Sequence, residues 1–294
     1  MSAAPVSAAG SGSPTIEPIR FDPAPNVLTV DFEEWFCICG DEHYSDPRNW
    51  DRFEPTIERS ADRVLERLSA AGARATFFVL GWIARRYPAL VRRAAAEGHE
   101  IAFHGMAHRR CDEMARGELL RDLAEGKSLL EDLGGARVEG FRAPEWSVRR
   151  PDDPVLEALA ESGYRYDASL TSIPLLGRAD NPPRAFALRT PAGRILEFPP
   201  LTGKGWGHTV HFGGGWAFRQ LSWRRILARA DEFRRGGSPA VFTFHPWEFD
   251  LDPPPLPGAS PLLRLTRAAH RRRLPNRFDR LLARGPFRRL GDLA

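Results

Sequence analysis

The sequence predicts an α/β protein built on a parallel sheet, either open or closed into a barrel, and two observations indicate this class. Short apolar, β-prone runs alternate along the chain with longer segments that have the apolar spacing of amphipathic helices. Several of the apolar runs end directly in an acidic residue, an arginine or a histidine. Parallel α/β folds bring such strand ends together at one edge of the sheet, so these residues are candidates for one common site.

The first half of the chain shows the clearest alternation. Ordered structure should begin at Asn26, where the apolar run 27–30 suits a strand that is covered on both faces. The next helix should bury an apolar stripe that extends from Ile57 to Leu68, and Gly72 should end it. The elements expected up to residue 133 are a helix over 55–71, a strand over 75–80, a helix over 87–97, a strand over 101–103 and a helix over 118–133.

The second half continues the alternation with longer irregular stretches. From Phe186 the regular alternation weakens, and residues 203–215 are expected to form a glycine- and aromatic-rich loop. The expected elements are a helix over 154–162, a strand over 195–200 that ends in two prolines, a helix over 222–235 and a last strand over 240–245.

Composition predicts three regions in the chain. Residues 1–25 are rich in alanine, serine, glycine and proline, so we expect a disordered lead. Residues 26–251 should form a single main domain, because the strand and helix patterns lie there. Residues 252–294 should be a proline-rich linker followed by an arginine-rich extension, with a helix packed on the outside.

The 294-residue length, with 42% hydrophobic and 27% charged residues, is typical of a soluble globular protein. The net charge of +4 is small, and no basic stripe interleaved with aromatic residues indicates nucleic-acid binding. Three cysteines, Cys37, Cys39 and Cys111, are too few for a disulfide framework. Because neither a signal peptide nor an apolar run of membrane-spanning length is evident, we expect a cytoplasmic protein, with peripheral membrane association left open.

A metal site is predicted around two histidines. The expected strand over 101–103 ends in His104 and His108, which are four residues apart. Four residues make about one helical turn, so both imidazoles can point the same way and share a cation. The first strand ends in Asp31 and Glu33, whose carboxylates are costly to bury unless they are paired or bind a metal.

Three further strand ends carry polar groups: Arg142, Asp167 and His245. Taken singly, each has a structural explanation, as an ion pair, a turn residue and a strand-end histidine, respectively. Because five separate strands end in such residues, a shared site explains them better than five coincidences do.

Five segments of the chain, 29–33, 104–108, 141–144, 166–169 and 244–248, carry a family resemblance. In their order the chain resembles the polysaccharide deacetylases of the NodB-homology type, also called carbohydrate esterase family 4. It is similar in particular to the branch encoded beside exosortase and exopolysaccharide genes. The resemblance implies a distorted (β/α) barrel, with 26–251 as a single catalytic domain. It also implies a divalent metal, most often zinc, with cobalt, nickel, iron or manganese as alternatives.

Two positions depart from the family pattern. The first motif of the family usually has two adjacent aspartates, whereas here Phe32 follows Asp31 and the next acid is Glu33. Because alternate residues of a strand share a face, we assign Asp31 as the general base and Glu33 as a metal ligand, with Glu34 as the alternative ligand. Gly105 stands where the family usually has a serine or threonine.

The resemblance implies roles for the remaining candidates. The metal ligands would be Glu33, His104 and His108. His245 would be the general acid and Arg142 would pair with Asp31, while Asp167 would either orient His245 or complete the arginine network. The residues expected to contact the saccharide are Pro144, Trp146 and Trp247, in part because sugar faces stack on indole rings.

The implied reaction is removal of N-acetyl groups from an acetylated amino sugar, in a polysaccharide or its lipid-linked precursor. The Asp31-x-Glu33 spacing also occurs in cyclic-imide hydrolases, so hydrolysis of a small cyclic amide is a second interpretation. Two histidines and a carboxylate suit an iron oxygenase as well, although the βα alternation argues against that class. A further interpretation is a relative that binds a saccharide but has no enzymatic activity. The sequence leaves the sugar, the metal and the oligomeric state open.

Overall fold

The computed structural model describes residues 15–38, 41–205 and 207–294. The strands are β1 (Thr15–Pro18), β2 (Asn26–Phe32), β3 (Thr76–Val79), β4 (Glu100–Phe103), β5 (Gly140–Phe141), β6 (Tyr166–Asp167), β7 (Phe186–Thr190), β8 (Gly193–Glu197), β9 (Thr202–Gly205), β10 (His208–His211), β11 (Ala240–Phe244) and β12 (Phe287–Arg288). The α-helices are α1 (Glu42–Ser45), α2 (Ile57–Ala70), α3 (Gly81–Arg86), α4 (Pro88–Ala96), α5 (Arg116–Gly134), α6 (Pro154–Glu161), α7 (Gly215–Gln220), α8 (Trp223–Arg235), α9 (Pro261–Ala268) and α10 (Arg273–Leu282). The short 3-10 helices are η1 (Pro47–Arg52), η2 (Cys111–Glu113), η3 (Pro144–Trp146) and η4 (Pro246–Phe249).

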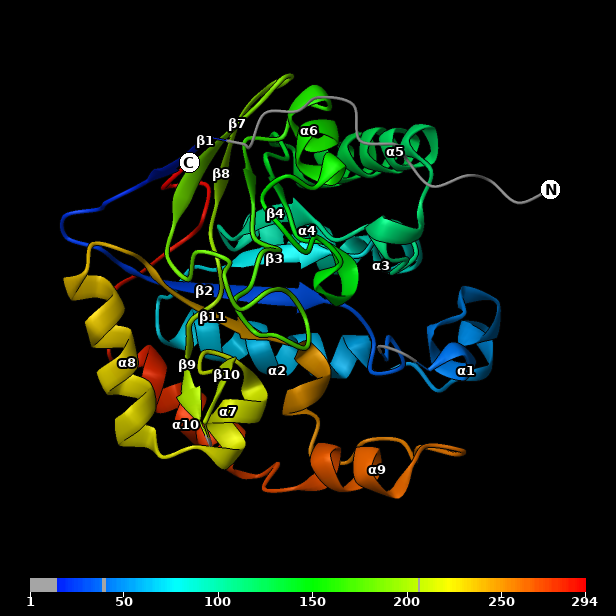
Figure 1. Cartoon of the computed structure of the whole chain (residues 1–294). Coiled ribbons are helices and arrows are strands. Elements are labelled where there is room, and N and C mark those ends of the chain that lie inside the picture. The colour runs from blue at the N-terminus through cyan, green and yellow to red at the C-terminus, as the bar shows by residue number, and fades with distance from the viewer. Residues whose placement is uncertain (1–14, 39–40, 206) are drawn as a thin grey trace.

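One large sheet organises the fold, in the order β1-β7-β8-β6-β5-β4-β3-β2-β11, with β12 beside β2. The strands from β8 through β6, β5, β4, β3 and β2 to β11 pair in parallel, whereas β1, β7 and β8 pair antiparallel at one end. In Figure 1 β7 and β8 run steeply across the direction of β2 and β11, so the sheet is strongly twisted. The mixed α/β fold with a parallel core, in the form of a distorted barrel, confirms the predicted class.

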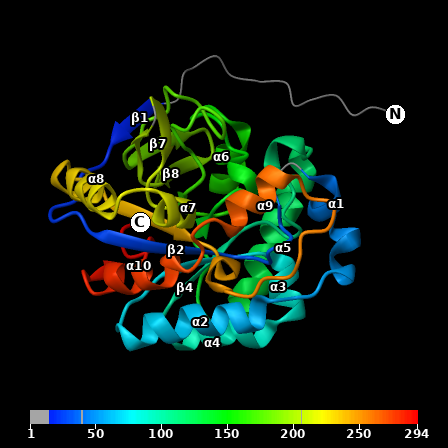
Figure 2. The same cartoon turned by 90° about the horizontal axis from the view of Figure 1, so that it is seen from below.

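The central strand β2 explains why the sheet has a buried middle. Every residue of its sequence Asn-Val-Leu-Thr-Val-Asp-Phe is buried, because helices and loops cover both faces. Helix α2 places Ile57, Val64, Leu65 and Leu68 in the core, and each has at most 1% of its surface exposed. This is the predicted apolar stripe. Figure 2 shows α2 and α4 together below the sheet, and the other predicted helices also form.

The structure differs from the expectation at the glycine-rich segment 203–215. Instead of a loop throughout, β9 and β10 form an antiparallel hairpin, and α7 follows at Gly215. A Cβ at Gly203 would lie 2.9 Å from the ring of Phe212, so glycine permits the close approach of this ring to the strand. Glycines that signal a loop in the sequence therefore serve packing inside a hairpin here. Trp206 lies outside the described residues.

The first and the last strands of the described residues both join the sheet. The expectation of disorder throughout residues 1–25 is wrong for residues 15–18, because β1 pairs with β7; residues 1–14 lie outside the described part. At the other end, β12 pairs with β2, and α10 buries Leu274, Phe278 and Leu281. The predicted helix of the C-terminal extension is present, and its apolar side belongs to the main core. In the described part of the chain, no helix has the length and apolar character that crossing a membrane requires.

A buried histidine predicts how stability depends on pH. The Nδ1 atom of His99 accepts a hydrogen bond of 3.2 Å from the amide of Ala75, and burial lowers the pKa of His99 to about 4. The unfolded chain takes up this proton near pH 6.5, whereas the folded chain resists until about pH 4. Stability is therefore complete above pH 6.5 and falls as the pH drops toward 4.

We expect the wild type to lose about 2 kcal/mol more than His99→Asn over this range, because the asparagine amide does not titrate. Urea unfolding of both proteins at several pH values measures the difference. Parallel curves for the two proteins would contradict the prediction.

Candidate metal-binding active site

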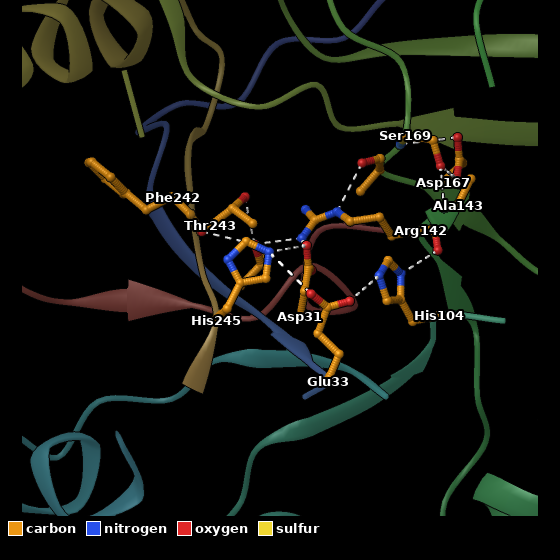
Figure 3. A network of polar contacts seen from close by, with 12 residues as sticks. Asp31, Glu33, His104, Arg142, Ala143, Asp167, Ser169, Phe242, Thr243 and His245 are labelled. Atoms are coloured by element: carbon orange, nitrogen blue, oxygen red, sulfur yellow. Dashed lines mark hydrogen bonds and ion pairs between the residues drawn. The ribbon is translucent and has the colours of Figure 1, made fainter. Parts of the chain in front are cut away.

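The predicted site residues lie at the carboxyl ends of neighbouring strands. Asp31 is the second-last residue of strand β2, His104 follows β4 directly, and Arg142 follows β5. His245 follows β11, which pairs with β2 on the side opposite β3. Figure 3 shows these side chains converging from their separate strands on Glu33. Parallel pairing alone explains the convergence, because it aligns all these strand ends at one edge of the sheet.

Glu33, His104 and His108 form a cluster that could hold a metal ion. One ligand atom from each residue lies within 4.8 Å of the others, and all three side chains are buried. The Glu33 Oε2 atom is 3.5 Å from Nε2 of His104 and 2.9 Å from Nε2 of His108. Two imidazoles and a carboxylate are a common ligand set for zinc with a fourth position left open.

The two histidines meet in a way that the sequence did not predict. Residues 104–110 form a loop and no helical turn, and both Gly105 and His108 have positive φ angles, of 78° and 52°. Glycine at position 105 suits this left-handed backbone, and a Cβ there would lie 3.2 Å from Pro144. The His104 ring is held by the Arg142 carbonyl oxygen, which accepts a hydrogen bond of 2.7 Å from Nδ1 and leaves Nε2 facing Glu33.

Glu34 is directed away from the cluster, to the beginning of α2. Its Oε1 accepts hydrogen bonds of 2.8 and 2.9 Å from the amides of Thr56 and Ile57. Strand β2 ends at Phe32, yet the alternation of side chains continues past it and separates Glu33 from Glu34. The alternative of Glu34 as the ligand therefore has no geometric support, because its carboxylate is the acceptor for the first turn of α2.

The charge of Glu33 depends on its neighbours. Burial would raise the pKa of this carboxyl, but the charge of His108 and hydrogen bonds from His104 and His108 outweigh burial and lower the pKa below its usual range. Glu33 is therefore an anion in the folded protein. Even so, Oε2 is a buried atom without a hydrogen bond of good geometry, which is the environment that a bound cation would complete.

Asp31 pairs with the buried arginine. The Arg142 Nη1 atom donates to Asp31 Oδ1 at 2.5 Å and to the Thr29 hydroxyl at 3.0 Å, while Nε donates to the carbonyl of Ala168 at 3.1 Å. The guanidinium also lies 4.1 Å from the ring centre of Phe78. Only 1% of the Arg142 surface is exposed. The expected pairing of Arg142 with Asp31 is therefore present in the structure, and it leaves Oδ2 of Asp31 facing His245.

His245 lies on the opposite side of Glu33 from His104, as Figure 3 shows. Its Nε2 is 3.7 Å from Asp31 Oδ2 and 3.8 Å from Glu33 Oε1. Its Nδ1 faces Glu248 Oε2 at 3.3 Å, and burial is outweighed by this hydrogen bond and by the three nearby carboxylates, which raise the pKa of His245 to about 9. Glu248 is thus the group that orients His245, a role that the sequence left to Asp167.

Asp167 has a different set of contacts. Its carboxylate accepts hydrogen bonds from the Ser169 hydroxyl and amide at 2.6 and 3.2 Å, and the Ser169 oxygen accepts one from the Ala143 amide. The Glu197 carboxyl lies close to Asp167, and each affects the pKa of the other. The first of the two expectations for Asp167, orientation of His245, is wrong in the described structure. Asp167 instead supports the backbone next to Arg142.

The expected saccharide-binding residues surround the cluster. Trp247 stacks on His245 with ring centres 4.9 Å apart, and the Trp146 ring lies 5.3 Å from the Arg142 guanidinium. Pro144 is buried against Gly105. His211 on β10 packs edge-on against Trp146 with ring centres 5.9 Å apart. Its place on β10 depends on the hairpin that the sequence did not predict.

Two family models match the chain. Residues 49–166 match the model described as "Polysaccharide deacetylase", and residues 168–294 match a "Domain of unknown function (DUF3473)". Curated relatives include a peptidoglycan-N-acetylglucosamine deacetylase from Bacillus cereus, 28% identical over 37% of this chain and 41% of the relative. A chitooligosaccharide deacetylase from Sinorhizobium fredii is 36% identical over 34% of this chain and 46% of the relative.

The chain spans less than half the length of these curated relatives. A crystal structure from Mycobacterium smegmatis, provisionally described as a polysaccharide deacetylase, superposes over 96% of this chain and 93% of that one, with a TM-score of 0.61 and 21% identity. This likeness supports the fold. The two family matches meet between residues 166 and 168, so the second crosses the boundary that composition predicts at 252.

The carboxyl pair behind Arg142 predicts a stability effect. Burial and the neighbouring Asp167 raise the pKa of Glu197 well above its usual value, which favours the protonated form of this carboxyl. Glu197 also accepts a hydrogen bond of 3.0 Å from the Leu170 amide. Glu197→Gln keeps both contacts and should unfold within about 0.5 kcal/mol of the wild type.

Glu197→Ala leaves the Leu170 amide and Asp167 without this partner and should cost about 1–3 kcal/mol. Thermal or urea unfolding of the two variants makes the comparison. A glutamine variant as unstable as the alanine variant would show that Glu197 is ionised.

Proposed function

We propose that this chain, which residues 49–166 and its curated relatives connect to the polysaccharide deacetylase family, is a metal-dependent hydrolase that removes N-acetyl groups from an acetylated amino sugar. The observation that carries the proposal is that a possible metal site and a set of acid–base side chains lie next to each other at one edge of the sheet. The cluster of Glu33, His104 and His108 offers a metal site, and the Asp31–Arg142 pair and His245 lie beside it. All these residues fall in the region 26–251 that we propose as the catalytic domain.

The donor set fits a divalent ion, and we favour zinc. Both imidazoles present Nε2 to Glu33 Oε2, which is a buried anionic atom without a well-formed hydrogen bond. A divalent ion held by these three residues would supply Lewis-acid activation of water and of the acetamide carbonyl. The Arg142 carbonyl would keep His104 in the tautomer that leaves Nε2 free to bind.

Asp31 is suited to take the proton of the attacking water. Arg142, which also donates to the Thr29 hydroxyl, holds Oδ1 of Asp31, and this hydrogen bond leaves Oδ2 directed toward His245. Since Arg142 is rigidly placed by its bond to Ala168, it fixes the carboxylate at the strand end. A positioned base of this kind contributes about 10²–10⁴-fold to the rate.

His245 is suited to return a proton to the leaving amine. Its Nε2 faces the two carboxylates of the site, and Glu248 contacts its Nδ1. The nearby carboxylates favour the protonated imidazole, so a proton is present to donate. We propose that two tryptophans contact the sugar: Trp247, which stacks on the His245 ring, and Trp146, whose ring lies beside the Arg142 guanidinium.

The finer assignments are also proposals. The likeness of the motif segments to the branch encoded beside exosortase and exopolysaccharide genes supports a role in exopolysaccharide biosynthesis. In that setting the substrate would be an acetylated polysaccharide or its lipid-linked precursor. The genes adjacent to this one in its genome test the assignment, and their lack of any glycosyltransferase or polymer-export gene would contradict it.

The two adjacent glutamates give a matched pair of variants for the metal site. Glu33→Gln removes an anionic ligand, whereas Glu34→Gln keeps an oxygen that can accept from the Thr56 and Ile57 amides. We expect zinc content, measured by mass spectrometry of dialysed protein, to fall from stoichiometric to a small fraction in Glu33→Gln and to stay near wild type in Glu34→Gln. Equal metal content in the two variants would contradict the assignment of Glu33.

Acetate release from a substrate panel tests the reaction. Zinc-loaded protein should release acetate from N-acetylchito-oligomers or an acetylated lipid-linked glycan, and Asp31→Asn should lower kcat by about 10²–10⁴-fold with little change in zinc content. Asparagine retains an acceptor for Arg142, and circular dichroism checks that the fold is kept. Release of ammonia or ring-opened product from hydantoins, with no acetate from any sugar, would favour the cyclic-amide alternative.

A further inference from the structure

A cavity of about 250 Å³ lies outside the cluster of Glu33, His104 and His108. Its walls are Trp35, the three prolines 253–255, and the arginines Arg264, Arg267 and Arg271. The arginines come from α9 and the segment after it, and the prolines come from the segment that precedes α9. We call this space the arginine cavity. It combines an apolar wall with three cationic side chains.

The arginine cavity adjoins the proposed active site. The guanidinium of Arg267 lies 4.1 Å from the ring centre of Trp247, and that ring stacks on His245. Arg267 Nη1 also donates a hydrogen bond of 2.6 Å to the carbonyl of Trp35, which is two residues after Glu33 in the chain. The two strand ends that carry Glu33 and His245 therefore both continue into the walls of the cavity.

Two buried acidic residues near the cavity, Asp250 and Glu248, have cationic partners. Asp250, which is almost fully buried, contacts Arg59 at 3.0 Å and Arg63 at 2.8 Å. Glu248 contacts His245 at 3.3 Å and lies 3.9 Å from Arg219. The side chains of these two carboxylates therefore form their ion pairs with groups that do not line the cavity.

Two of the three cavity arginines have unused donors. Arg271 donates from Nη1 to the Asp250 carbonyl at 2.6 Å, but its Nε is buried and has no acceptor among the described residues. Burial and the charge of Arg219 lower the pKa of Arg271, although Asp250 and Glu248 act in the opposite direction. The Arg264 side chain makes no hydrogen bond or ion pair with any described residue. An anion in the cavity would satisfy these donors.

We propose that the arginine cavity binds an anionic group, a phosphate or a carboxylate, carried by the saccharide whose acetamide the adjacent site hydrolyses. The inference rests on the proposed function, and it adds the charge of the substrate to it. Arginine suits such groups because its planar donors match their oxygens in pairs. The proline and tryptophan walls are apolar, and a less polar surrounding strengthens the attraction between an anion and the guanidinium groups.

The test compares substrates that differ only in charge. Triacetylchitotriose is neutral, its 1-phosphate carries a phosphate, and its aldonic acid carries a carboxylate. Acetate release by zinc-loaded wild type should show a kcat/KM at least about tenfold higher for one of the anionic substrates, equivalent to one or two charge-assisted hydrogen bonds. The preferred substrate identifies whether the group is a phosphate or a carboxylate.

The variants locate the effect. Arg264→Gln should abolish most of the preference through KM and leave the neutral trisaccharide unchanged; this side chain is exposed, so the fold should tolerate the change. Arg272→Gln, an exposed arginine that does not line the cavity, is the matched control and should keep the preference. Equal kcat/KM for neutral and charged substrates in the wild type, or equal effects of the two variants, would overturn the proposal.

A binding measurement separates this inference from the reaction itself. Calorimetric titration with glucose 1-phosphate and gluconate, with glucose as the neutral control, should detect binding of an anion to wild type and Arg272→Gln that Arg264→Gln weakens severalfold. If no sugar releases acetate but this pattern holds, the cavity proposal stands and the proposed reaction fails. If acetate is released without charge preference and neither anion binds, the reaction stands and the cavity proposal fails.

Discussion

The buried guanidinium of Arg142 is the interaction on which the site depends. The guanidinium contacts Asp31 and Thr29 on β2, the Ala168 carbonyl after β6 and the Phe78 ring on β3. The backbone carbonyl of the same residue accepts a hydrogen bond from His104, which follows β4. A charge taken out of water is costly unless its partners are fixed, and removing one partner of a buried pair typically costs about 3–5 kcal/mol. The strand ends must therefore keep the arrangement in which the buried guanidinium has all these hydrogen-bond partners. That arrangement also defines the place of the base and of a metal ligand.

The adjacent acids Glu33 and Glu34 show how backbone alternation assigns chemistry. The Glu33 carboxylate lies among histidines, and its Oε2 atom lacks a well-formed hydrogen bond. The Glu34 carboxylate accepts hydrogen bonds from the amides at the beginning of α2. Both are buried, yet their pKa values shift in opposite directions, because cationic neighbours outweigh burial for Glu33 and burial outweighs neutral amides for Glu34. Two residues of the same type, one peptide apart, thus become an anion beside cationic histidines and a helix-terminal acceptor.

The sequence predicts the parts of the site that depend on strand order and alternation. Apolar runs followed by Asp31, His104, Arg142 and His245 were sufficient to place these residues at one edge, because parallel pairing aligns strand ends wherever it occurs. It does not predict contacts that depend on the path of a loop. The four-residue histidine spacing indicated a helical turn, but positive φ angles at Gly105 and His108 bring the rings together. Glu248 stands three residues after His245, the spacing of a capping box, so local sequence could have indicated this contact. Glu197 is thirty residues after Asp167, and nothing in local spacing distinguishes it from a surface acid.

Trp247 connects the proposed active site with the arginine cavity through its neighbours on each side, and its position follows from the short helix η4 after β11. One contact of its ring is with His245 and another is with the Arg267 guanidinium. The active-site side gathers the carboxylates of Asp31 and Glu33, whereas the cavity side has Arg264 and Arg271 with donors that no described residue accepts. Opposite charges close together in a protein interior attract each other, and a rigid group between them prevents a direct ion pair. The indole ring contacts His245 and Arg267, and Glu248 and Asp250, which follow it in the chain, already have partners in His245 and Arg63. Under the two proposals, a metal ion and an anion would therefore each bind close to this one aromatic residue.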